Sequence, residues 1–278
     1  MKESTIKNHN VTTYVREFDS LAEFYDYITQ TPVNIAFTNQ SHSSIKGTES
    51  FTQTKSFEEA VGLFKNGWRE EAIRLEKMLK DKAKDTHIKT KARPTYSVEG
   101  FQCSVPRYLQ GMPDSMINRK NVPVKDKVIT INKEINYNAM TSTSTIEAES
   151  VKALSLINNI EAQGHRCNLN LVLSTERTKG KTKTREMAKI RIKSANERLN
   201  VSKLAFPLVH PSMLRRLLFR YIEIAPTVTR DYVWGYGSPT ATSTVRGLLK
   251  QLGYENEYVI PCFLPENVND VKSLQDLK

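Results

Sequence analysis

The segment CNLNLVLSTERTKGKTKTREMAKIRIK, residues 167–193, contains two alternating patterns that together indicate the fold. Its first part has apolar residues at odd positions: Cys167, Leu169, Leu171 and Leu173. Its last part has apolar residues at even positions: Ala188, Ile190 and Ile192. Such alternation is typical of strands, and the change of parity fits a hairpin whose loop has an even number of residues. We therefore expect a hairpin with one buried face and a turn around Gly180.

Positive charges occupy the other register of the second strand. Eight of the nine odd positions between 177 and 193 carry Lys or Arg: Arg177, Lys179, Lys181, Lys183, Arg185, Lys189, Arg191 and Lys193. We expect the last three to lie on an open face, opposite the apolar one. This basic ribbon predicts contact with a polyanion such as nucleic acid. The alternative is an edge strand that its charges keep soluble.

The elements around the hairpin alternate in type. A strand at 128–131 and a helix from Thr145 to about Gln163, ended by Gly164, precede it. A short apolar strand at 204–209, a helix that starts at His210-Pro211, a helix at about 244–252 and a strand at 258–264 follow it. This order predicts a three-layer α/β fold with a mostly parallel sheet and one antiparallel edge hairpin.

The first third of the chain reads differently. Capping-box pairs predict helices after Ser20 and Ser56, and the second helix is expected to run from Phe57 to about Lys84. Residues 1–93 are therefore interpreted as a mainly helical region. Residues 94–127 contain four prolines and are expected to form an irregular connection to the α/β domain at 128–265. Residues 266–278 form a polar tail.

Several motifs resemble those of an uncharacterised family of tailed-phage proteins. They are Gly67-Trp68-Arg69-Glu70, Val105-Pro106-Arg107-Tyr108-Leu109-Gln110-Gly111-Met112-Pro113, Lys203-Leu204-Ala205-Phe206-Pro207 and Met213-Leu214-Arg215-Arg216. In element order, the later half is also similar to a von Willebrand factor A-like domain. The metal site of such domains needs an Asp-x-Ser-x-Ser run after the first strand, where this chain has Asn132-Lys133-Glu134-Ile135-Asn136. We therefore expect a metal-free version of that fold.

Composition limits the function. The chain has 278 residues and a net charge of +11, from 41 Lys and Arg against 30 Asp and Glu, which favours polyanionic partners. Three widely spaced cysteines imply neither a disulfide framework nor a zinc site. No apolar run reaches the length of a membrane span. The sequence shows no phosphate-binding glycine loop and no metal-ligand motif, so we expect no cofactor, no metal and no catalytic residues.

Aromatic residues supply a second candidate surface. Tyr232, Trp234 and Tyr236 stand at alternate positions and would form a row in an extended segment, where exposed rings can stack on bases. The alternative is ordinary packing of aromatic side chains in the core. The helix that contains Arg215, Arg216 and Arg220 is either a DNA-reading helix or a solvated face.

These features lead to one functional hypothesis and two rivals. The first is a non-enzymatic, phage-encoded protein that binds nucleic acid, with single-stranded DNA favoured. It would assist replication or transcription in the cytoplasm of the infected bacterium, alongside a phage or host polymerase. The second is an adaptor that binds a host or virion protein. The third is an enzyme whose site is assembled from distant residues.

Overall fold

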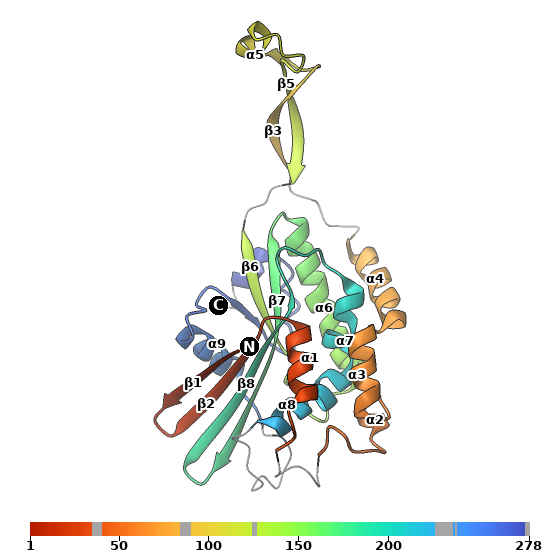
Figure 1. Cartoon of the computed structure of the whole chain (residues 1–278), viewed down its shortest axis with the longest axis vertical. Helices are drawn as coiled ribbons and strands as arrows, with labels where there is room; N and C mark the ends of the chain where they lie inside the picture. Colours follow the sequence, from red (N-terminus) through yellow and green to blue (C-terminus); the bar gives the residue numbers. More distant parts are fainter. Residues whose placement is uncertain (35–40, 84–89, 124–126, 226–235, 237, 276–278) are drawn as a thin grey trace.

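The computed structural model describes residues 1–34, 41–83, 90–123, 127–225, 236 and 238–275. Most of them form one α/β body around a mixed sheet of seven strands, with a second, three-stranded sheet extending from it as an arm (Figure 1). Within the described part of the chain, no helix is both long and apolar enough to cross a membrane.

The main sheet mixes parallel and antiparallel pairs. Its strands follow the order β1-β2-β8-β7-β6-β10, and β9 pairs with the far end of β7. The pairs β2–β8, β6–β7 and β6–β10 are parallel, whereas β1–β2, β7–β8 and β7–β9 are antiparallel. The strand bounds are β1 Lys2–Asn8, β2 Val11–Phe18, β6 Val128–Glu134, β7 Arg166–Lys179, β8 Thr182–Lys193, β9 Ser238–Pro239 and β10 Tyr258–Ile260.

Helices cover both faces of this sheet, so the body has three layers (Figure 1). One face carries α1 Leu21–Gln30, α3 Phe57–Asn66, α4 Arg69–Ala83, α6 Thr143–Ala162, α7 Val201–Val209, the π-helix η2 Met213–Leu218 and α8 Phe219–Ile224. The short helix α2 Glu49–Thr52 lies beside η2. The other face carries α9 Thr242–Gln251, whose Val245 and Leu248 pack on Val15, Val172 and Met187. The short helix α10 Val271–Leu274 follows near the C-terminus.

The β7–β8 hairpin confirms the prediction from the alternating residues. Leu171 pairs with Ile190 and Leu173 with Ala188, and all four side chains are buried in the larger core. The turn consists of Gly180 and Lys181, and Gly180 has a φ of 61°, in the left-handed region that favours glycine. The strands therefore share one buried face across a two-residue loop.

Helix caps confirm two of the expected starts and move the third. Ser20 accepts a hydrogen bond from the Glu23 backbone, and Ser56 accepts one from the Glu59 backbone. Helix α6 begins earlier than expected, at Thr143, because Ser142 is its cap. The long helix expected from Phe57 to Lys84 is wrong: Gly67, with a φ of 82°, ends α3 before α4 begins.

Three sheet predictions were also wrong. Residues 204–209, expected as a strand, lie in the helix α7, which Asn200 caps and which buries most of its side chains. The prediction failed because a wholly apolar run does not distinguish a buried strand from a buried helix. The sheet is mixed rather than mostly parallel. The β8 strand is not an edge, since β2 pairs with it from Val11 to Phe18. The N-terminal region therefore contributes two strands to the body as well as helices.

The arm occupies residues that were expected to be irregular. Its strands β3 Thr90–Ser97, β5 Met116–Pro123 and β4 Gln102–Cys103 are ordered β3-β5-β4, and α5 Val105–Leu109 lies at its tip (Figure 1). The prolines misled the prediction because they stand where regular structure tolerates them. Pro94 lies in the edge strand β3, and Pro106 lies in the first turn of α5.

Candidate functional site

The basic ribbon does not form an open row of cations. Lys189 and Lys193 are both buried, for different reasons. Residues after α9 cover Lys189, on the face that was expected to be open, whereas a register shift in the β7–β8 pairing places Lys193 opposite Leu169 and against the end of α6. Lys193 Nζ donates to Glu161 Oε1 at 2.6 Å and to the Cys167 carbonyl at 3.0 Å. Lys189 Nζ lies 3.5 Å from the centroid of the Tyr254 ring and donates to Glu257 Oε2 at 2.8 Å. These two lysines hold the fold together and face no solvent.

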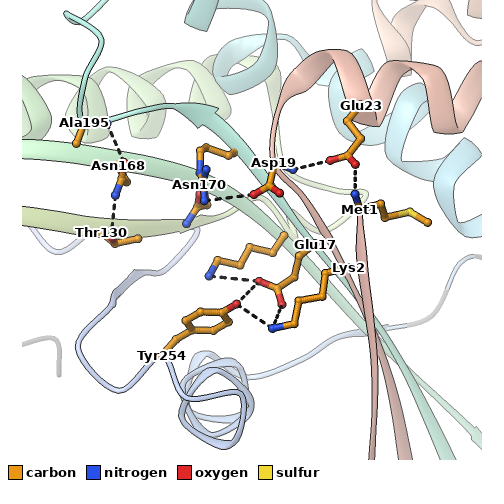
Figure 2. Close-up of polar contacts among 12 residues, drawn as sticks. Met1, Lys2, Glu17, Asp19, Glu23, Thr130, Asn168, Asn170, Ala195 and Tyr254 are labelled. Atoms are coloured by element: carbon orange, nitrogen blue, oxygen red, sulfur yellow. Dashed lines mark hydrogen bonds and ion pairs between the residues drawn. The ribbon is translucent and has the colours of Figure 1, made fainter.

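Carboxylates balance the cations at this end of the sheet. Figure 2 shows Glu17, Lys2 and Tyr254 turned toward one another, and Tyr254 donates to Glu17 at 2.7 Å. The cations there are Lys2, Lys189 and Arg191, and the carboxylates are Glu17, Asp19 and Glu257. Three positive and three negative groups cancel, so this cluster does not attract a polyanion as a bare row of cations would.

The outer half of the ribbon is partly paired as well. Glu176 accepts from both Lys183, at 2.9 Å, and Arg185, at 2.6 Å, and these bonds lower the pKa of its carboxyl group. Arg177 is buried and donates to the Tyr236 carbonyl at 3.0 Å. Lys181 is exposed at the turn, and the side chain of Lys179 lies outside the described residues. Among the ribbon side chains that the structure describes, Lys181, Lys183 and Arg191 remain accessible.

The aromatic row can be followed only at Tyr236, because Tyr232 and Trp234 lie outside the described residues. Tyr236 is buried, and its ring stacks on Phe219 with the centroids 4.3 Å apart. Its hydroxyl donates to Glu223 and accepts from the His42 backbone. Tyr236 therefore packs in the core, as the alternative interpretation proposed.

The arginines after His210 also face inward, so neither a DNA-reading helix nor a solvated face describes Arg215 and Arg216. Arg216 is completely buried and donates six hydrogen bonds to residues 43–54. Arg215 is buried beside it and donates to the carbonyls of Phe51 and Thr141. Both side chains fix an irregular segment onto the helical layer.

The described residues form no metal-binding group, and the thiols of Cys167 and Cys262 are not activated. No group of three or more His, Cys, Asp or Glu side chains there could hold a metal ion. His210 is buried between Trp68 and Phe206, and its Nδ1 accepts from the Ser212 backbone. Burial raises the pKa of both Cys167 and Cys262 to about 12, so neither thiol is an activated nucleophile.

The arm is a well-bonded structure despite its small size. The Arg107 guanidinium donates to both Asp114 carboxylate oxygens, at 2.6 and 2.7 Å, and lies over the Tyr96 ring at 4.3 Å. The Phe101 backbone donates to the Ile117 carbonyl at 3.0 Å. At Gly100, a Cβ atom would meet that carbonyl oxygen at 2.3 Å, so only glycine allows this close approach. These contacts link the tip helix and the strands of the arm to one another.

The surface of the arm is unusually apolar. Seven large apolar side chains are exposed on it: Tyr96, Val98, Phe101, Val105, Tyr108, Leu109 and Met112. The exposed fractions of Leu109 and Tyr108, on the tip helix, are 78% and 67%. No described residue of the arm belongs to either core of the body. These side chains form the arm surface, and they are the candidate functional site.

This surface was not predicted from the sequence, although part of it lies in the motif at residues 105–113. The run Val105-Pro106-Arg107-Tyr108-Leu109 has an apolar composition but neither a helical nor a strand period long enough to assign a face. The sequence signal for this surface was an apolar run between prolines that could not be assigned to the buried face of a helix or a strand.

Comparison with curated proteins and with solved structures gave no match. A family match, in contrast, extends from residue 3 to residue 277 and thus includes both the body and the arm. The chain therefore belongs to the family described as Domain of unknown function (DUF7192).

Proposed function

We propose that this protein is a non-enzymatic adaptor that binds another protein through the arm surface. The observation that carries the proposal is the exposure of seven large apolar side chains on one small, ordered projection. Contiguous exposed apolar surface on a soluble protein typically marks an interaction site. The three-layer body would serve as the base from which the arm reaches its partner.

The composition of the arm favours a protein over a nucleic acid. Protein interfaces are enriched in Tyr, Phe, Met and Arg, which the arm supplies as Tyr96, Tyr108, Phe101, Met112 and Arg119. Nucleic acid would use the aromatic rings and the cations but has little use for exposed aliphatic groups such as Val98, Val105 and Leu109. Residues 90–123 contain five basic and two acidic side chains. The expected partner therefore offers an apolar groove with carboxylates at its rim.

The test uses the exposed Cys103, which lies beside the tip. A photoreactive group attached to Cys103 is used to crosslink the protein in lysate from its host, with and without nuclease. The same partner is then purified and its affinity is measured directly. Leu109→Ser combined with Tyr108→Ser is expected to lower that affinity at least tenfold, because exposed anchors of this kind dominate interfaces.

Ile73→Ser is the matched control, since Ile73 is equally apolar and exposed but lies on α4 of the body. It is expected to leave binding unchanged. If the tip variant and the control bind the purified partner equally, or if capture requires nucleic acid, the arm does not have the proposed role.

Nucleic-acid binding remains the second candidate. Its support is the net charge of +11 together with the exposed Lys181 and Lys183 at the tip of the β7–β8 hairpin. Replacing Lys181, Lys183 and Arg185 by Glu is expected to abolish binding to a single-stranded oligonucleotide on this hypothesis, and the affinity should fall steeply with salt. An unchanged anisotropy titration in this variant would exclude a role for the ribbon. The resemblance to tailed-phage proteins supports action in an infected bacterium under either candidate.

A further inference from the structure

A pocket of about 440 Å³ opens on the body, at the end of the sheet where β6 finishes. Residues of the loop after β6 and of β7, η2, α8, β9 and α2 meet there, together with His42 and Tyr236. Apolar and aromatic side chains form most of its wall: Phe51, Tyr137, Leu173, Leu214, Phe219 and Tyr236. In open α/β sheets, ligands bind in crevices at the carboxyl ends of parallel strands, and a mainly apolar pocket with few polar groups is typical of small-molecule sites.

Arg215 lines this pocket with a charge that no carboxylate neutralises. Its guanidinium donates to three backbone carbonyls, those of Phe51 at 2.6 Å, Thr141 at 2.8 Å and Ala139 at 3.4 Å. No ion pair joins it to any carboxylate of the described residues, although only 4% of the side chain is exposed. A buried charge is normally paired, because its transfer out of water is costly. An anion in the pocket would supply the missing partner.

Thr175 adds a second unsatisfied group to the same wall. Its side chain is 6% exposed, and its hydroxyl has no hydrogen-bond partner among the described residues. Buried hydroxyl groups almost always have a partner. Thr175 Oγ1 has almost no accessible area, so the side chain has to rotate toward the cavity before this hydroxyl can donate to a ligand oxygen.

The helix that carries Arg215 is itself irregular. Met213–Leu218 is a π-helix, a form that is rare and frequently found at functional sites. Its wider turn places Leu214 and Arg215 together in the pocket wall, while Arg216 points into the 43–54 segment. Arg215 therefore combines its bonds to three backbone carbonyls with a place in the pocket wall, whereas Arg216 is bound entirely within the 43–54 segment.

We propose that this pocket binds a small monoanion with a flat apolar body, of which an aromatic carboxylate is the simplest example. The carboxylate would face Arg215 and accept from Thr175, and the ring would lie among Phe51, Tyr137 and Phe219. Inorganic phosphate fits less well, because it has no apolar part for these walls and the pocket offers a single cation. The inference does not depend on the function of the arm.

The test is a titration of the full chain with phenylacetate by saturation-transfer NMR, beside its neutral analogue phenylacetamide. Phenylacetate is expected to bind with a dissociation constant of about 1 mM or lower, and phenylacetamide at least tenfold more weakly. N-acetylglycylphenylalanine is the third probe, because the carboxyl end of a peptide offers the same chemistry. Binding of phenylacetate assigns the pocket to a free acid, and binding of the dipeptide alone assigns it to a chain terminus.

Two variants locate the binding. Thr175→Val removes a hydroxyl that has no partner, so the fold should be unaffected while phenylacetate affinity falls about tenfold. Ser238→Trp places a large side chain at the exposed edge of the pocket and should abolish binding, whereas Asn196→Trp, on an exposed loop elsewhere, should not. The proposal is overturned if neither acid binds below about 10 mM, if the amide binds equally well, or if Ser238→Trp has no effect.

Discussion

Replacing Arg216 by Met is expected to destabilise the body strongly, because it removes the donor of a buried hydrogen-bond network. The guanidinium is fully buried, and its six hydrogen bonds are donated to Ser43 O, Ile45 O, Thr54 O and the hydroxyls of Thr48, Thr52 and Thr54. Methionine fills a similar volume but donates nothing. The three carbonyls and three hydroxyls would lose their shared donor at once.

The magnitude follows from these contacts. Each hydrogen bond from a charged donor contributes about 1.5–3 kcal/mol, but burying the guanidinium offsets a large part of their sum. Removing one member of a buried charged network typically costs about 3–5 kcal/mol. That loss lowers the folding equilibrium constant by roughly two to four powers of ten. Arg216→Lys, which keeps the charge but has fewer donors, is expected to fall between wild type and Arg216→Met.

Urea unfolding followed by circular dichroism measures the effect as a change in the free energy of unfolding. Lys203→Met is the control: Lys203 is about half exposed and forms an ion pair with Glu197, so its loss should cost less than about 1 kcal/mol. The reasoning would be refuted if Arg216→Met lost no more stability than Lys203→Met. That result would mean that the 43–54 segment is held by other contacts.

Three further predictions concern the arm, the thiols and pH. Gly100→Ala should leave the melting temperature of the body unchanged but alter the arm amide signals in NMR spectra, because the new Cβ would meet Ile117 O at 2.3 Å; unaltered signals would contradict the close approach. A thiol reagent should react first with the exposed Cys103 of the native protein, more slowly with the partly exposed Cys262, and with Cys167 only after unfolding; rapid native labelling of Cys167 would contradict its burial. Burial between two rings lowers the pKa of His210 to about 4. Between pH 6.5 and 4 the unfolded chain therefore binds more protons than the folded protein. The free energy of unfolding should fall by up to about 3 kcal/mol as the pH drops through that window. His210→Gln should flatten this part of the curve of unfolding free energy against pH, and an unchanged slope would show that other groups cause it.

Local patterns predicted the central hairpin because both its strands alternate and glycine stands at its turn. Cys167, Leu171 and Ile190 each reach the core as their parity requires. The same reasoning failed for the opposite face. Alternation predicts that Lys189 and Lys193 share a side of the strand, but a register shift opposite Leu169 turns Lys193 toward Glu161 of α6. Alternation also does not show what covers Lys189. Helix α9 and Tyr254, more than fifty residues later, do so.

The other failures share this cause. Residues 2–18 contain mixed polar and apolar side chains, and they become strands by pairing with each other and with β8, which is far away in sequence. Residues 204–209 are apolar enough for either a buried strand or a buried helix. The Asn200 cap and the packing against α4 and α6 make them part of helix α7. Arg216 looked solvated because its neighbours in sequence did not include the segment that it binds.

The arm shows why charge and burial must be considered together when a binding surface is sought. On the sheet, Lys189 and Lys193 bind carboxylates or backbone carbonyls within the fold. Their charges are therefore used inside the protein and are not available to a partner. On the arm, the best-placed cation, Arg107, is likewise bound to Asp114 and lies over the Tyr96 ring, yet Tyr108 and Leu109 of the tip helix remain mostly exposed. Exposed apolar surface that packs on no core is then a better indicator of a binding site than positive charge, because the folded protein does not bury it. By that criterion the arm surface, and not the basic ribbon, is where we propose that this protein meets its partner.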